Sequence, residues 1–132
     1  LLMGIDEAAM SPKNAIKRND IYVSGNLFKH SKGKSKFLWQ LSQLPTKYKI
    51  VLENRYLSQN QYYERLSQSK YTFTFVQNSG ITNSRGFEAA AMGCKSFYQE
   101  GSGLGIFLEE IQSLVPYSDE SFTKTVLHAL EN

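Results

Sequence analysis

An arginine and a glutamate at the head of a run of small residues are the side chains of this sequence best suited to meet a ligand. Residues 83–99 read NSRGFEAAAMGCKSFYQ, so Arg85 and Glu88 lead into three alanines. A carboxylate one turn into a helix can accept two hydrogen bonds from vicinal hydroxyls, such as those of a ribose. An arginine in the first turn can meet a phosphate at the helix N-terminus. Their i,i+3 spacing also fits a solvated ion pair of about 0.2–0.5 kcal/mol, so packing, binding and catalytic roles all remain open.

The elements around this pair can be predicted from turn and cap residues. Asn83 or Ser84 fits a helix N-cap and Gly93 a helix end, with alanines that allow close packing on a sheet. The aromatic and β-branched run 71–76 predicts a strand before this helix, and KSFYQ at 95–99 predicts a strand after it.

A second candidate site is the loop at 24–34, SGNLFKHSKGK. Gly25 permits a tight turn, and Lys29, Lys32 and Lys34 follow it. A diphosphate needs backbone N–H donors, a helix N-terminus and one or two cations, and this loop can supply all three. The spacing matches neither a Walker A loop nor G-x-G-x-x-G, so an ordinary surface loop is the alternative.

Charge is unevenly distributed along the chain of 132 residues, whose net charge is +3. Residues 13–36 carry seven basic residues and one acidic residue, whereas residues 100–132 are mainly acidic. This asymmetry indicates a region that meets an anion or a solvated basic face. No helix carries a sustained basic stripe, which argues against nucleic acid as the partner. No apolar stretch approaches the roughly 18–20 residues of a membrane span.

Cysteine and histidine suggest neither a disulfide nor a metal centre. Cys94 is the one cysteine, so no intrachain disulfide can form, and we expect a reducing, cytoplasmic location. The thiol is either reactive or, as most buried cysteines are, a small apolar filler. His30 and His128 have no neighbouring ligands in sequence, so we expect them to be structural or solvated and predict no metal site.

The chain as a whole alternates predicted strands with predicted helices, which implies a three-layer Rossmann-like α/β domain with a mainly parallel sheet of about five strands. Ser58 and Gln61 have the spacing of a capping box, and Ser118 is expected to cap the last helix with Asp119 and Glu120 in its first turn. Ligands of such sheets bind beyond the carboxyl ends of the strands, so the loops 24–34 and 77–84 are the expected site. The strands are predicted at 20–26, 48–54, 71–76, 95–99 and 113–118, and the helices at 34–44, 58–70, 84–93, 107–111 and after 118.

Several segments of the sequence resemble a known family. The segment SRGFEAAAMGCKSFYQEGSGL at 84–104 is similar to the R-x-F/L-E-A-x-A-x-G-x-P-V signature of GT-B glycosyltransferases of the group 1 type, and most closely to the spore-maturation-like group. Three further segments resemble that family in the same order, namely 3–12, 21–34 and 114–126.

The resemblance implies a nucleotide-diphosphate sugar, with UDP, GDP or a similar base, as donor substrate rather than cofactor. It implies that Glu88 grips the ribose and that Gly25, Asn26, Lys32 and Lys34 hold the diphosphate. The helix start at Asn83, Ser84 and Arg85 would face the phosphates or the sugar. Residues 1–19 resemble the interdomain linker and 20–132 the donor-binding half of the GT-B fold, so we expect an N-terminal acceptor domain outside this sequence and little transfer by this chain alone.

The sequence also departs from the family pattern. Gly80 stands where the E-x7-E form of the motif has its first acid, and Asn26 replaces the usual loop arginine, so Lys32 or Lys34 must supply the charge. The proline after the helix is replaced at Lys95 or Ser96, and the length leaves out one β-α unit. Two alternatives stay open: a fucosyltransferase-like GT-B domain, loosely similar over 71–102, and a non-catalytic α/β binding module.

Overall fold

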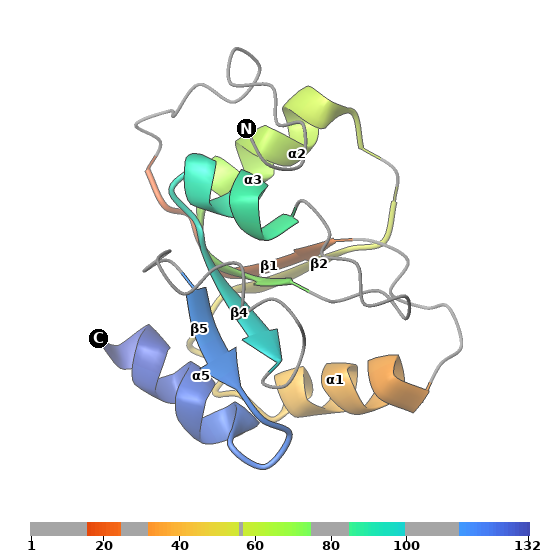
Figure 1. Cartoon of the computed structure of the whole chain (residues 1–132), viewed down its shortest axis with the longest axis vertical. Coiled ribbons are helices and arrows are strands. Elements are labelled where there is room, and N and C mark those ends of the chain that lie inside the picture. The colour runs from red at the N-terminus through yellow and green to blue at the C-terminus, as the bar shows by residue number, and fades with distance from the viewer. Residues whose placement is uncertain (1–15, 25–31, 56, 75–84, 100–113) are drawn as a thin grey trace.

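The computed structural model describes residues 16–24, 32–55, 57–74, 85–99 and 114–132. Five parallel strands form one sheet in the order β2-β1-β3-β4-β5, as Figure 1 shows. The predicted parallel α/β fold is therefore confirmed, with residues 71–74 of the predicted strand 71–76 in the central strand. The strands are β1 (Asn19–Ser24), β2 (Ile50–Glu53), β3 (Ser69–Thr74), β4 (Lys95–Gln99) and β5 (Leu114–Tyr117), and the helices are α1 (Lys32–Ser42), α2 (Gln59–Ser67), α3 (Arg85–Ala91) and α5 (Phe122–Glu131).

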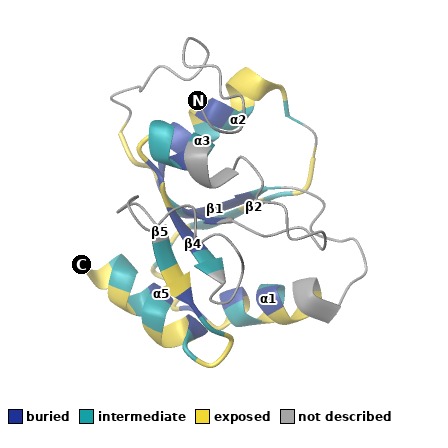
Figure 2. Ribbon diagram, in the orientation of Figure 1, coloured by how far each residue is buried: buried dark blue, intermediate teal, exposed yellow. Residues whose placement is uncertain are grey.

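Helices cover both faces of the sheet and complete three layers: α1 and α5 lie on one face, α2 and α3 on the other (Figure 1). Alternation along β1 divides its side chains between the two cores. Ile21 and Val23 enter the core under α1 and α5, whereas Tyr22 enters the core under α2 and α3. The outer sides of the helices carry the exposed residues (Figure 2).

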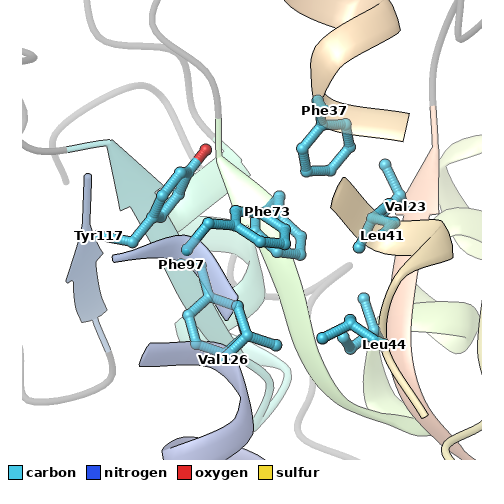
Figure 3. Packing of buried hydrophobic residues seen from close by; sticks show 10 residues of the cluster. Val23, Phe37, Leu41, Leu44, Phe73, Phe97, Tyr117 and Val126 are labelled. Carbon is cyan, nitrogen blue, oxygen red and sulfur yellow. The ribbon is translucent and has the colours of Figure 1, made fainter. Parts of the chain in front are cut away.

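Aromatic rings dominate the core under α1 and α5 (Figure 3). Phe73 of β3 lies at its centre: its ring centroid is 4.8 Å from that of Phe37, 5.0 Å from Phe97 and 5.6 Å from Phe122. Offset and edge-on ring pairs add about 0.5–1.5 kcal/mol each to the burial of their area. This core fixes α1 and α5 against the central strands.

The helix signals read from the sequence are partly confirmed. The capping box of α2 is present, with Gln61 N–H donating to Ser58 Oγ and Ser58 N–H donating to Gln61 Oε1. However, α2 is shorter than predicted, because the Gln68 carbonyl turns away to accept from the backbone N–H groups of Arg18 and Asn19. The most deeply buried tyrosine of α2 is Tyr63 rather than Tyr62.

The predicted start of the last helix is wrong. The helix begins at Phe122, so Asp119 and Glu120 lie in a turn before it and not in its first turn. Ser118 Oγ accepts from the Ser121 N–H at 3.1 Å, and Ser121 Oγ accepts from the Ser118 N–H at 2.9 Å. This reciprocal pair closes the turn and delays the helix by one turn. The short helix predicted at 107–111 lies outside the described residues.

Among the residues that the structure describes, no helix has the length and apolar character needed to cross a membrane.

Candidate functional site

The sheet has its topological switch point between β1 and β3. The chain leaves β1 for β2 on one side and returns to β3 on the other, so β1 and β3 are neighbours with both carboxyl ends at one edge. In open parallel sheets this crevice is the preferred ligand position. The two loops predicted as the site follow these two strands, although residues 25–31 and 75–84 themselves lie outside the described part.

Two helix N-termini point at this edge. Helix α1 begins at Lys32, after the loop that follows β1, and α3 begins at Arg85, after the loop that follows β3. The first four N–H groups of a helix have no partner within it, and the helix dipole adds a partial positive charge there. A pair of such termini beside a switch point favours an anionic ligand.

The predicted phosphate lysines occupy helix positions rather than loop positions. Sequence analysis placed Lys32 and Lys34 in the loop or at the helix boundary, but both lie in the first turn of α1. Arg85 is the first residue of α3, and the predicted cap at Asn83 or Ser84 lies outside the described residues. The side chains of these three residues lie outside what the structure describes, as do the four remaining predicted residues, Gly25, Asn26, Asn83 and Ser84.

Glu88 is the predicted site residue whose side chain the structure describes. It is half-buried in the fourth position of α3, and its carbonyl accepts from the Met92 N–H at 3.1 Å. The next residue, Ala89, is fully buried against the sheet together with Met92. Because successive helix positions are about 100° apart, this packing turns the Glu88 side chain away from the core.

The C-terminal end of α3 is held by a Schellman motif. Gly93 has φ of +74°, and its N–H donates to the Ala90 carbonyl at 3.1 Å. The Cys94 N–H donates to the Ala89 carbonyl at 2.8 Å, and both side chains lie in the same buried cluster. The predicted helix end at Gly93 is confirmed, and it sets where Glu88 stands along the helix axis.

Sequence analysis missed an ion pair at the carboxyl end of β2. Arg65 Nε of α2 donates to Glu53 Oε1 at 2.8 Å, and Arg55 Nε lies 3.7 Å from Glu53 Oε2. The hydrogen bond to Glu53 raises the pKa of Arg65. In the sequence Glu53 stands alone at the end of an apolar strand. The only sign of a partner is an arginine, Arg65, twelve positions further along the chain. The pair ties α2 to the strand edge beside the switch point.

Cysteine and histidine offer no reactive centre in the described part of the chain. Burial raises the pKa of the Cys94 thiol to about 12, and the opposing effect of Lys17 is smaller, which favours the filler role over the reactive one. His128 is exposed near the end of α5, where the Asn132 side-chain amide donates to its carbonyl. The described residues hold no cluster of three or more His, Cys, Asp and Glu suited to a metal ion.

A hollow of about 650 Å³ lies along α5, with Tyr71, Val115 and Ala129 among its lining residues. Tyr71 and Val115 stand toward the amino ends of β3 and β5, and Glu88, the predicted site residue with a described side chain, is not among the lining residues. It is therefore separate from the switch-point site.

Comparison with known proteins gives one family match. Residues 10–132 match a family model described as glycosyl transferase-like. No curated protein matches the chain.

Proposed function

Because the chain belongs to the glycosyl transferase-like family, we propose that it forms the donor-binding domain of a GT-B glycosyltransferase of the group 1 type and binds a nucleotide-diphosphate sugar. In this proposal residues 20–132 hold the donor and residues 1–19 lead to an acceptor domain. The spore-maturation-like group remains the subgroup whose motif the segment 84–104 resembles most.

The observation that carries the proposal is the convergence of α1 and α3 on the switch point. Their N-termini flank the adjacent carboxyl ends of β1 and β3. The first turns contain Lys32, Lys34 and Arg85, three cations at helix ends that already favour anions. A diphosphate carries the charge and the acceptor oxygens that such an arrangement stabilises.

Each predicted residue has a role in this arrangement. The diphosphate meets the lysines of α1 and the backbone of Gly25 and Asn26. Asn83, Ser84 and Arg85 face the phosphates or the sugar. Glu88, one turn further along α3, accepts hydrogen bonds from the ribose hydroxyls, which places the nucleoside beside α3 and leaves the sugar at the open edge of the sheet.

Binding can be tested by thermal shift and calorimetry with UDP, GDP and their sugars. A ligand at 100 times its dissociation constant stabilises the folded protein by about 2.7 kcal/mol. Absence of any shift or heat with all of these nucleotides at millimolar concentration would refute the proposal.

The role of Glu88 can be tested with Glu88→Ala, which keeps a good helix former at that position. We expect it to weaken binding of the preferred nucleotide by about 1.5–3 kcal/mol, the range of a hydrogen bond to a charged group. Glu64→Ala is the matched control, since Glu64 is an exposed glutamate of α2. Equal affinities of the two variants would return Glu88 to a surface role.

A further inference from the structure

The two outer strands of the sheet differ in how well they are protected from further pairing. Within the described residues, β5 pairs with β4 alone and β2 with β1 alone, so each has a free edge. β5 contains Pro116, and a proline lacks the N–H that an added strand needs. β2 is Ile-Val-Leu-Glu and contains no such block. Its free edge is therefore the one open to another strand.

The backbone of β2 turns a defined set of groups toward that edge. The Ile21 N–H of β1 donates to the Lys49 carbonyl at 3.2 Å, so Lys49 faces β1. Alternation along a parallel ladder then turns Val51 and Glu53 toward β1 as well and directs the N–H and C=O groups of Ile50 and Leu52 outward. A partner strand would bind through these two residues.

The side chains along this edge are apolar on the α1 face. Leu52 lies opposite Val23 in the register and so on the face covered by α1 and α5, yet it is 44% exposed. Lys36 and Gln40 of α1 reach Asp119 on the β5 side of the sheet. Helical geometry puts Leu38 on the opposite flank of α1, toward β2, where it can join Leu52.

From this edge we infer that the chain forms a homodimer in which β2 pairs antiparallel with β2 of a second copy. Only a few registers are compatible both with a two-fold axis and with pairing of the outward-facing backbone groups of Ile50 and Leu52. The register centred on Val51 makes Ile50 and Leu52 of the two copies hydrogen-bonded partners. It also places Lys49 of each copy opposite Glu53 of the other, on the same sheet face, because side chains at odd positions share that face. Lys49 would there join the carboxylate that Arg65 already binds within the copy.

Neighbouring registers fit less well. A register centred on Leu52 would oppose Lys49 to Arg55, two like charges, and would lose the pair of Lys49 with Glu53. The register centred on Val51 instead sets Arg55 opposite Lys47, which lies in a turn outside the extended segment. A register centred on Ile50 would pair Glu53 with Lys47, which lies in a turn before the extended segment. The charge pattern of β2 thus favours self-pairing about Val51, and the result is one sheet continuous across two domains, with both carboxyl-edge sites left open.

Sedimentation equilibrium over about 1–500 µM protein tests the dimer. We expect reversible dimerisation of the wild type and, in Lys49→Glu, a dissociation constant raised at least about tenfold, because two attractive pairs become repulsive. Lys124→Glu makes the same charge change at an exposed position of α5, beside the opposite edge of the sheet, and should leave the dissociation constant unchanged. An effect of Lys124→Glu equal to that of Lys49→Glu would overturn the register.

A second variant tests the strand pairing itself. Leu52→Pro deletes an outward N–H without removing one that faces β1, so the domain should keep its circular dichroism spectrum and become monomeric. If this variant unfolds, Lys49→Glu alone decides. A wild type that stays monomeric at 500 µM would overturn the inference and would fit Lys49 as a charge that protects a free edge. A wild-type dimer whose dissociation constant does not change in Lys49→Glu would also overturn it, because the two copies would then meet elsewhere.

Discussion

A single lysine before β1 holds three separate elements together. Lys17 Nζ donates to the carbonyl oxygens of Ser67 at 3.0 Å, Ser69 at 3.0 Å and Gly93 at 2.9 Å. These carbonyls belong to the end of α2, the start of β3 and the end of α3. Partial burial lowers the pKa of Lys17, because removing the ammonium group from water costs free energy. The three hydrogen bonds offset that desolvation cost.

Lys17→Met should therefore destabilise the domain. The substitution keeps the length of the side chain but leaves three carbonyls without their donor, and we expect a loss of about 1.5–3 kcal/mol in the free energy of unfolding, measured in urea. Lys36→Met is the control, since Lys36 pairs with Asp119 at 3.1 Å on the exposed surface and such pairs contribute about 0–1 kcal/mol. Equal losses in the two variants would show that the Lys17 contacts add nothing specific.

At the residue scale, the sequence identified what lies within one segment and missed what pairs across segments. Arg85, Glu88 and Gly93 could be read together because cap residues, small residues and a family-like motif stand within nine positions. Lys17 contacts backbone carbonyls at least 50 positions away. Every residue has such a carbonyl, so the sequence does not indicate which ones Lys17 will contact. Glu53 and Arg65 meet only after β2 and α2 pack side by side, which spacing in the sequence does not show.

At the scale of one element, α3 depends on the left-handed residue that ends it. Gly93→Ala should cost about 1–2 kcal/mol of stability, because an L residue at φ of +74° is strained. A Cβ there would lie 3.8 Å from Lys17 Nζ, an ordinary contact, so the cost is conformational rather than steric. Thermal unfolding of Gly93→Ala and Gly93→Asn checks this.

The asparagine variant should lose less, since asparagine tolerates the left-handed region better than alanine. The ranking Gly, then Asn, then Ala would support the conformational account. An alanine variant as stable as the wild type would mean that the chain relaxes into another helix end.

Element boundaries were predictable where a side chain makes the cap and uncertain where a turn competes with it. Ser58 and Gln61 cap α2 as their spacing predicts. Ser118 has the residue type of a cap, but its hydroxyl closes a turn with Ser121, and both arrangements offer the same N–H···O bond. The choice depends on where Phe122 can reach the aromatic core, which is a tertiary effect.

At the scale of the molecule, the alternation of strands and helices was sufficient to predict a parallel three-layer fold. The observed order puts β1 beside β3, and the site beside the carboxyl ends of these two strands stays a prediction. The free edge of β2 could not be predicted, because edge and inner strands of a parallel sheet are both short apolar runs.

The whole domain should lose stability at alkaline pH, because acids on both faces of the sheet are buried in their neutral forms. Burial, and for Tyr22 also the Glu53 carboxylate, raises the pKa of Tyr22, Cys94 and Tyr117 to about 12. An acid whose pKa is higher in the folded than in the unfolded state stabilises the fold fully below its ordinary pKa and loses that contribution as the pH rises toward the folded value. The free energy of unfolding should thus fall above about pH 9, by up to about 1.4 kcal/mol per pH unit for each group.

Chemical denaturation at pH 7.5 to 11.5 measures this slope, and Tyr22→Phe isolates one contributor. Among the described residues the Tyr22 hydroxyl is buried without a hydrogen bond of standard geometry, so its removal should leave stability at pH 7.5 unchanged or slightly higher. Between pH 10 and 11.5 this variant should lose stability less steeply than the wild type, because it lacks one acid whose pKa burial raises. Identical slopes for the two proteins would show that Tyr22 ionises as readily in the folded chain as in the unfolded one, and that its burial contributes nothing to the loss of stability at alkaline pH.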